Sequence, residues 1–478
     1  MTSVLRHRQA LIDGEWADGG DGVIEVRSPH SGEVVGTMTR CTAAQADRAV
    51  QAAKSAFPQW RQVPLLDRVD LLYRAHAICG ERNEAIARQI SLEMGKTIRE
   101  SREEMVEYAC EHFRRAAEDV LRYRGQFLPS TQERTNNKRI VVSQEPAGVV
   151  AVITPWNFPV DIAAITICYA LAIGNTVVWK PSEYAPLSSA MLADVFVDAG
   201  FPPGTVNMVT GEGTAGRAVA EHPGIDAIVF TGSTKTGQQI ASSIGLKKRV
   251  LELGGNGPII VRHDADLDRA ADAAITGCFY LAGQCCTAAE RLLVHESVRD
   301  DFVARLVTRA SKLRVGDPLD DASDMGPLCN PGVLERTRRH VATAVAQGAK
   351  VVLGGTSSGL YYQPTVLVEV TGQMDIAREE TFGPVAPVIS FSSDEEAISI
   401  ANETGYGLTA AMFTNDLRMA WHVAESLQHG TVMVNETTNY WDQLAPFGGR
   451  GKSGTGRELS SWMLDALTDT KQIVFDIG

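Results

Sequence analysis

Long apolar runs and paired cysteines are both missing from this sequence. No stretch of 18 or more apolar residues occurs, so we expect no membrane-spanning helix. The opening residues, MTSVLRHRQALIDGEWADG, hold no apolar core of the kind found in secretory signals. Eight cysteines, none in a C-x-x-C pair, argue against a disulfide scaffold, a zinc site and thioredoxin-like chemistry. We therefore expect free thiols in a reducing compartment, the cytoplasm, and no metal.

Positive charge is scarce as well. The chain has 45 Lys and Arg against 58 Asp and Glu, a formal net charge of −13. So acidic a chain is repelled by phosphate backbones and by anionic membrane surfaces, and we expect neither nucleic acid nor a membrane as a partner. Its 44% of apolar and 22% of charged residues are typical of a globular protein. At roughly 100–200 residues per domain, the length predicts two or three domains.

The pattern of apolar residues changes along the chain. A short β-rich segment precedes a helix that begins with a capping box of Thr42 and Gln45, and two longer helical patterns cover 65–92 and 97–124. From about residue 147, strands alternate with helices, which is typical of a parallel α/β sheet. The predicted strands are 149–153, 176–179, 206–209 and 227–230 in a first block, and 258–261, 291–294, 350–353, 385–391 and 431–434 in a second.

Two further strand-like segments, 138–145 and 471–477, fit neither block. Exposed strand edges tend to pair with another chain. We expect these segments to pair with a second subunit, and pairing within the chain is the alternative.

Glycine-rich loops suggest where a nucleotide binds. The pattern G-x-G-x-x-G occurs once, over 211–216, but the next strand lacks the terminal acid that a dinucleotide site needs, so we interpret it as a turn and helix start. Lys180 and Glu183 follow an earlier strand, where an ammonium and a carboxylate group can bond to ribose hydroxyls. Ser233 opens a helix after the last strand of the block, a position that favours an anion.

Three side chains have the chemistry of a covalent catalyst. Cys285 and Cys286 follow a glycine, where backbone N–H groups can lower a thiol pKa; the other six cysteines are expected to be inert core. Glu252 lies in an apolar, glycine-flanked turn, where burial suits either a general base or a structural carboxylate. Asn157, between two prolines, is either an oxyanion donor or part of an ordinary turn.

Together these segments resemble the aldehyde dehydrogenase superfamily over nearly the whole chain. The matching motifs are TPWNFP at 154–159, KPSE at 180–183, FTGST at 230–234, LELGG at 251–255, GQCC at 283–286, EETFGPV at 379–385 and PFGGRGKSGTGRE at 446–458. The resemblance implies an α/β fold with a Rossmann-like NAD(P)-binding domain, an α/β catalytic domain and a small β oligomerisation element. The expected boundaries are 1–123 with 147–252, 253–452, and 124–146 with 453–478, in that order.

The resemblance also implies roles for individual residues. Cys286 is the nucleophile, Asn157 and the Cys286 backbone N–H form the oxyanion hole, and Glu252 is the base, whereas Cys285 has no essential role. Residues implied to contact the cofactor are Thr154, Trp156, Lys180, Glu183, Ser233, Glu380 and Phe382. Residues implied to line the substrate pocket are Phe158, Asp161, Ile162, Ile165, Tyr440, Trp441 and Leu444. Glu458 matches a second carboxylate that is sometimes assigned to a proton path.

The implied reaction is the NAD(P)-dependent oxidation of an aldehyde to a carboxylic acid. A thiohemiacetal and then a thioester form on Cys286, and water activated by Glu252 hydrolyses the thioester. Glu183 should accept from a ribose 2′-hydroxyl and repel a 2′-phosphate, so NAD is expected, with NADP as the alternative because of Lys180. The resemblance implies a homodimer or homotetramer. A CoA-acylating relative and a catalytically silent protein of the same fold are the alternative functions.

The chain departs from the family pattern at three positions and leaves the aldehyde open. Leu281 replaces a frequent asparagine, Asn256 a frequent lysine and Thr166 another lysine, so a proton path through Glu458 lacks its usual partner. The aromatic and aliphatic pocket suits an uncharged aldehyde, and Asp161 disfavours a carboxylate. An arginine from the helix over 105–124, Arg114 or Arg115, would instead bind an anionic semialdehyde.

Overall fold

A Rossmann-like sheet forms the core of the first half of the protein in the computed structural model, which describes residues 7–18 and 20–478. Its strands, in spatial order, are β22 (Gly454–Thr455), β12 (Lys248–Glu252), β11 (Ala227–Thr231), β8 (Val149–Ile153), β9 (Thr176–Lys180), β10 (Val206–Met208), β2 (Ala10–Ile12) and β3 (Glu15–Ala17). The five central strands, β8 to β12, are parallel, and the order reverses between β8 and β11. Ligands of such sheets bind at the carboxyl ends of the strands beside this reversal.

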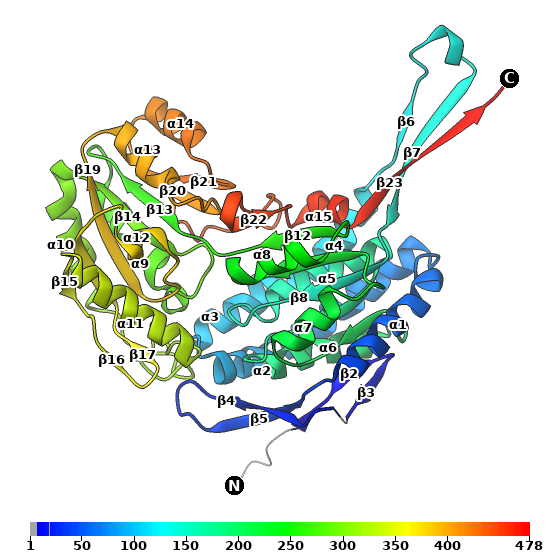
Figure 1. Ribbon diagram of the computed structural model, residues 1–478, viewed down its shortest axis with the longest axis horizontal. Coiled ribbons are helices and arrows are strands. Elements are labelled where there is room, and N and C mark those ends of the chain that lie inside the picture. Colours follow the sequence, from blue (N-terminus) through cyan, green and yellow to red (C-terminus); the bar gives the residue numbers. More distant parts are fainter. Residues whose placement is uncertain (1–6, 19) are drawn as a thin grey trace.

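A second, seven-stranded sheet occupies the other half of the molecule (Figure 1). Its strands are β15 (Lys350–Leu353), β18 (Thr365–Val370), β19 (Val385–Phe391), β14 (Ala289–His295), β13 (Gly257–Val261), β20 (Thr409–Phe413) and β21 (Thr431–Val434). All neighbours are parallel except β15 and β18. The apolar residues of β13 and β14 are almost fully buried, as expected for strands covered on both faces.

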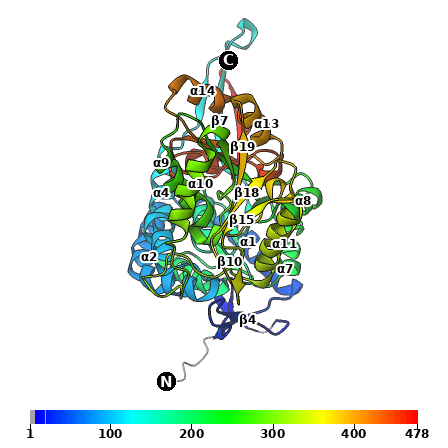
Figure 2. The same cartoon turned by 90° about the vertical axis from the view of Figure 1, so that its left-hand side faces the viewer.

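Helices cover both sheets (Figures 1 and 2). Those of the first half are α1 (Ala43–Trp60), α2 (Leu65–Met94), α3 (Ile98–Glu103), α4 (Cys110–Arg122), α5 (Asp161–Ile173), α6 (Pro186–Ala199), α7 (Gly213–Ala220), α8 (Thr234–Ser243) and α15 (Ser460–Ala466). Those of the second half are α9 (Leu267–Phe279), α10 (Arg299–Ala310), α11 (Pro331–Ala346), α12 (Asp375–Arg378), α13 (Asp394–Asn402) and α14 (Leu417–Ser426). The capping box expected at Thr42 is present at the start of α1.

Three small sheets complete the fold. They are β1 (His7–Arg8) with β5 (Val34–Thr39) and β4 (Val23–Arg27), the pair β16 (Ser357–Ser358) and β17 (Tyr361–Tyr362), and a projecting arm of β23 (Thr468–Asp476), β7 (Lys138–Pro146) and β6 (Gln126–Leu128). Figure 1 shows the arm extending away from the two large sheets, with the C-terminus at its end. Of the two alternatives for 138–145 and 471–477, the structure shows pairing within the chain, since β7 and β23 pair antiparallel over Lys138–Pro146 and Thr468–Asp476. Contact of this arm with a second subunit stays a prediction.

The α/β class and all nine predicted strands are confirmed, but the sequence pattern missed strands in both sheets. β12 was missed because it begins with a lysine and an arginine and is buried only from Val250 onward. Glu252 therefore ends a central parallel strand and does not lie in a turn. β20 contains two alanines, which favour helices, and β18 was missed although its residues are typical of a strand.

The helix expected over 97–124 is interrupted. A π-helical segment, Glu104–Ala109, separates α3 from α4, because one extra residue is inserted in the helical turn. The apolar spacing of the sequence cannot show this insertion. It matters for the site, because π-helical turns re-aim the side chains at their ends.

All eight cysteines are free thiols. None of the helices in the described part of the chain is long and apolar enough to cross a membrane. Location in the cytoplasm stays a prediction.

Candidate active site

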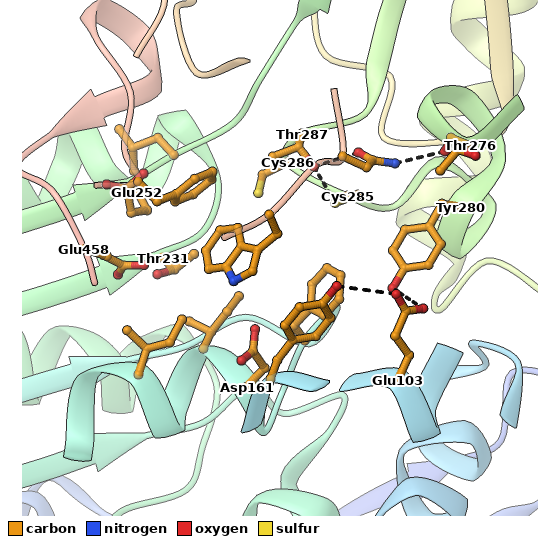
Figure 3. Close-up of a pocket in the computed structure, with 18 residues that line it drawn as sticks. Glu103, Asp161, Thr231, Glu252, Thr276, Tyr280, Cys285, Cys286, Thr287 and Glu458 are labelled. Carbon is orange, nitrogen blue, oxygen red and sulfur yellow. Dashed lines mark hydrogen bonds between the residues drawn. The ribbon is translucent and has the colours of Figure 1, made fainter. Parts of the chain in front are cut away.

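One cavity brings together side chains from both large sheets (Figure 3). Thr231 and Glu252 come from the ends of β11 and β12, and Cys285 and Cys286 come from the loop that follows α9. The cavity thus lies where the carboxyl ends of the first sheet face the second half of the chain, the position at which α/β sheets bind ligands.

The loop that carries the thiols has an unusual backbone. Leu281, Ala282 and Gly283 all have positive φ, at 51°, 55° and 74°. A left-handed conformation costs a residue with a Cβ roughly 1–2 kcal/mol, so other contacts must hold this turn. Buried Glu100 supplies one of them, because its Oε1 accepts the Leu281 N–H at 2.8 Å. This hydrogen bond helps Leu281 to adopt the left-handed conformation. Asparagine, which is frequent at this position in the family, tolerates that conformation better.

Gln284 fastens the loop at three points. Its side-chain Nε2 donates to the Leu281 carbonyl at 2.9 Å, and its Oε1 accepts the Cys329 N–H at 2.8 Å. Its backbone carbonyl accepts from Asn157 Nδ2 at 3.1 Å. Asn157 follows β8, so this last bond ties the thiol loop to the first sheet. It uses one N–H of the amide and leaves the second for a ligand.

The two adjacent thiols act as a pair. Their hydrogen bond, with the Cys286 thiol donating, is the largest cause that lowers the pKa of Cys285, to about 7, and the largest cause that raises the pKa of Cys286. The Thr287 hydroxyl, 3.0 Å from Cys285 Sγ, also lowers the pKa of Cys285. The pair therefore loses its first proton more easily than an isolated thiol. Cys286 is the partly exposed member and so the one that a ligand meets.

Two buried carboxyl groups lie on the cavity wall formed by β12 and the segment near 458. Burial, and then the charge of Glu458, raises the pKa of Glu252 well above its usual range. Burial, and then the charge of Asp161, raises the pKa of Glu458 to about 8. No described residue makes a well-formed hydrogen bond to either oxygen of Glu252, although the nearby Gly449 backbone and the charge of Arg457 lower its pKa somewhat against the effect of burial. A carboxylate of raised pKa beside a thiol is a stronger base than a free one and can take a proton from water.

The residues expected to contact the adenosine half of a dinucleotide lie along the carboxyl edge of the first sheet. Lys180 ends β9, and its Nζ donates to Glu183 Oε2 at 3.2 Å, so an ammonium group and a carboxylate lie side by side. Ser233 is the N-cap of α8 and accepts the Thr236 N–H at 3.3 Å. A ribose and a phosphate fit this set of groups.

The residues expected near the nicotinamide lie between the two halves. Glu380 Oε1 accepts the Gly255 N–H at 2.8 Å, and a Cβ at Gly254 would come within 2.7 Å of Glu380 Oε2, so a larger residue at 254 would displace this carboxylate. The Trp156 and Phe382 rings meet edge to face with centroids 5.6 Å apart. Thr154 Oγ1 accepts from Trp179 Nε1 at 3.0 Å, so its hydroxyl holds the core of the sheet.

Five of the seven residues expected in the substrate pocket line the cavity: Phe158, Asp161, Ile162, Ile165 and Trp441. Tyr440 and Leu444 lie outside the lining and are more than half exposed. Neither of the two arginines suggested for an anionic aldehyde lines the cavity, and Arg114 instead bonds Glu111 and Glu118 on its own helix.

Several lining residues were not predicted from the sequence. They are Glu103, Tyr108, Thr231, Leu253, Thr276, Tyr280, Thr287, Asn439 and Phe447. Glu103 directly precedes the π-helical segment and Tyr108 lies within it, and the sequence does not reveal this segment. Tyr280 and Thr287 adjoin the thiols, so their nearness in the chain could have indicated them. Within the described part of the chain, no cluster of three or more His, Cys, Asp or Glu residues suits a metal ion.

Comparisons with known proteins agree along the whole chain. The model of the aldehyde dehydrogenase family matches residues 16–473. A succinate-semialdehyde dehydrogenase [NADP(+)] of Escherichia coli K12 is 38% identical, and a glutarate-semialdehyde dehydrogenase of Pseudomonas aeruginosa 37%, each over 98% of both chains. The crystal structure of betaine aldehyde dehydrogenase from Staphylococcus aureus in complex with NAD+ is similar with a TM-score of 0.95 and 34% identity, covering 98% of this chain and 95% of that one.

The effect of Cys285 on the pKa of Cys286 predicts how the reactivity of Cys286 depends on pH. In a Cys285→Ala variant the hydrogen bond and charge that raise the pKa of Cys286 are gone, so that pKa falls. Because only the thiolate is alkylated, the midpoint of Cys286 modification by iodoacetamide should move to lower pH, as measured by peptide mass spectrometry across a pH series. Cys41→Ala, which removes a buried thiol between β5 and α1, is the control. An unchanged or raised midpoint in Cys285→Ala would contradict the paired arrangement.

Proposed function

Because this chain belongs to the aldehyde dehydrogenase family, and so oxidises an aldehyde with a nicotinamide cofactor, we propose that Cys286 is its nucleophile. Asn157 and the Cys286 backbone N–H form the oxyanion hole, and Glu252 activates water. The observation that carries this proposal is the shared cavity, which holds a reactive thiol pair and an unpartnered carboxyl group of raised pKa.

The first half of the reaction forms a carbon–sulfur bond. The Cys286 thiolate adds to the aldehyde carbon, and the electron pair of the carbonyl bond moves to its oxygen. The second N–H of Asn157 stabilises this oxyanion, while its first N–H keeps the thiol loop in place. Each such donor is worth about 3–4 kcal/mol in other enzymes. A nicotinamide cofactor, when bound beside Cys286, would supply the acceptor for the hydride of the former aldehyde carbon, and Cys286 then holds the acyl group as a thioester.

The second half hydrolyses the thioester. Glu252 takes a proton from water, the oxygen attacks the acyl carbon, and the Cys286 thiolate leaves as the carboxylic acid forms. Glu458 is coupled electrostatically to Glu252 and can receive the proton next. A CoA-acylating enzyme would not need a base at Glu252, so the buried and unpartnered state of this residue favours hydrolysis over transfer to CoA.

Lys180, Glu183 and Ser233 hold the adenosine half of the cofactor, and Glu380 and Phe382 hold the nicotinamide half, in this proposal. Trp156 lies beside Phe382, and Thr154 positions this part of the first sheet. NAD is preferred to NADP because Glu183, a partly exposed carboxylate, would repel a 2′-phosphate.

The physiological aldehyde does not follow from the relatives. Their names specify succinate semialdehyde, glutarate semialdehyde and betaine aldehyde, which carry charges of opposite sign. The charges of the cavity itself are the better guide to the substrate.

A Glu252→Gln variant tests the division into two halves. Glutamine keeps the shape but cannot accept the proton of water, so thioester formation continues and hydrolysis slows by at least about 100-fold. Rapid mixing with aldehyde and cofactor should give a burst of about one equivalent of reduced cofactor per site, followed by almost no turnover. Glu425→Gln, on the exposed face of α14, should turn over as the wild type does. Steady turnover without a burst in Glu252→Gln would refute the assigned base.

A Glu183→Gln variant tests the cofactor preference. Wild-type protein should have the higher kcat/KM with NAD. Removing the carboxylate leaves Lys180 unneutralised, so kcat/KM for NADP should rise relative to that for NAD by roughly tenfold. Steady-state kinetics with both cofactors measures the ratio. A wild-type preference for NADP would contradict the proposal.

The projecting arm supports a homo-oligomer. Phe127, Phe475 and Ile477 on the arm are 63%, 53% and 58% exposed, an apolar surface that a second copy of the chain would cover. Light scattering should give a multiple of the chain mass of 51.6 kDa, and Phe475→Asp should lower it toward that of one chain. A wild-type mass of one chain would contradict the oligomer.

A further inference from the structure

The cavity beside Cys286 is strongly acidic. Four carboxyl groups line it, those of Glu103, Asp161, Glu252 and Glu458, and among its described lining residues there is no arginine, lysine or histidine. Glu252 and Glu458, with raised pKa values, serve the hydrolytic half of the reaction. Glu103 and Asp161 neither accept nor pass on the proton of water in the proposed reaction, although the charge of Asp161 raises the pKa of Glu458, and Figure 3 shows both on the side of the cavity opposite Cys286. An aldehyde whose carbonyl carbon meets Cys286 would extend its far end toward this side.

Glu103 lines the cavity from the position directly before the π-helical turn. Glu103 ends α3, and Tyr108 lies five residues later, the spacing at which side chains stack across a π-helical turn. The Tyr108 hydroxyl donates to Glu103 Oε1 at 3.4 Å, and the Tyr280 hydroxyl donates to Oε2 at 3.3 Å. Both bonds are long, and no ion pair of Glu103 occurs among the described residues. Its charge is therefore left largely uncompensated.

Asp161 forms a hydrogen bond with a buried histidine. His112 Nε2 lies 2.7 Å from Asp161 Oδ1, on the side away from the cavity, and His112 is fully buried. The buried cation Lys96 does not line the cavity either: it pairs with Glu104 and packs on the Phe158 ring. Neither His112 nor Lys96 therefore meets a substrate directly.

Aromatic rings surround the two carboxylates. Tyr108, Phe158, Tyr280, Trp441 and Phe447 all line the cavity. Burial, and then the charge of Glu103, raises the pKa of both Tyr108 and Tyr280, as expected where the local potential is negative. Ring faces beside carboxylates are the arrangement by which proteins bind ammonium groups, because both attract a cation.

We propose that this cavity takes an aldehyde that carries an ammonium or quaternary ammonium group, with Glu103 and Asp161 facing the cation. The inference rests on the proposed function and adds its substrate class. An aldehyde with a terminal carboxylate would instead face Glu103 and Asp161 with no cationic side chain among the described lining residues, and its binding is disfavoured. An uncharged aldehyde fits but leaves the charge of Glu103 uncompensated.

The test is a set of aldehydes of equal chain length that differ only at the far end. The four ends are a primary ammonium group, a trimethylammonium group, a methyl group and a carboxylate, and reduced cofactor is followed by absorbance. The kcat/KM of wild-type protein should be at least tenfold higher for both cations than for the methyl compound, and lowest for the carboxylate. A preference for the methyl or the carboxylate compound would overturn the substrate class while leaving aldehyde oxidation intact. No oxidation of any of the four would count against the proposed function itself.

Matched variants test which carboxylate faces the cationic end of the aldehyde. Glu103→Gln removes the charge and keeps the shape, so the ratio of kcat/KM for the ammonium compound to that for the methyl compound should fall at least fivefold, through KM more than kcat. Glu107→Gln removes an exposed carboxylate from the same π-helical turn, outside the cavity, and should leave this ratio as it is. Equal ratios in wild type and Glu103→Gln would overturn the role of Glu103. Asp161→Asn provides the same comparison for the second carboxylate.

Discussion

The anchoring of the thiol loop to the first sheet is the interaction on which the rest of the site depends. The Gln284 carbonyl receives the Asn157 amide, and the Gln284 side chain bonds on to Leu281 and Cys329. These bonds hold two residues with a Cβ in the left-handed region, a conformation that a free loop would leave. They fix the nucleophile, the oxyanion donor and the carboxyl wall relative to one another, although these come from distant parts of the chain.

Burial changes the acid–base properties of the carboxyl groups in the cavity. Glu252 and Glu458 gain raised pKa values because β12 and the segment near 458 enclose them, and they influence each other through their charges. The thiols influence each other through one hydrogen bond. On the opposite wall, the Glu103 carboxyl group receives only two long hydrogen bonds, from two tyrosines, so its oxygens remain available to a ligand. One small cavity can thus provide a base on one side and a cation site on the other.

Motifs that lie within single loops could be recognised from the sequence, and features that depend on geometry could not. The thiol pair, Asn157 and the acid after β9 were found because neighbouring residues specify them. Glu252 was found, but its strand was not, because charged residues at the start of β12 conceal the apolar pattern. Glu103 was missed because the helix expected over 97–124 is interrupted directly after it, and a 3.6-residue periodicity does not show which side chains face the cavity there. Tyr440 and Leu444 were expected in the pocket because the resemblance implies that the loop before the PFGG motif lines it, and of the three residues named from this loop only Trp441 does so.

The most direct test of the central claim, that the anchored loop makes Cys286 the reacting thiol, is to locate the acyl group. Acid quenching of Glu252→Gln protein after mixing with aldehyde and cofactor, followed by peptide mass spectrometry, identifies the acylated cysteine. The geometry predicts one acyl group per chain, on Cys286. An acyl group on Cys285, or none on either thiol while reduced cofactor is formed, would contradict it.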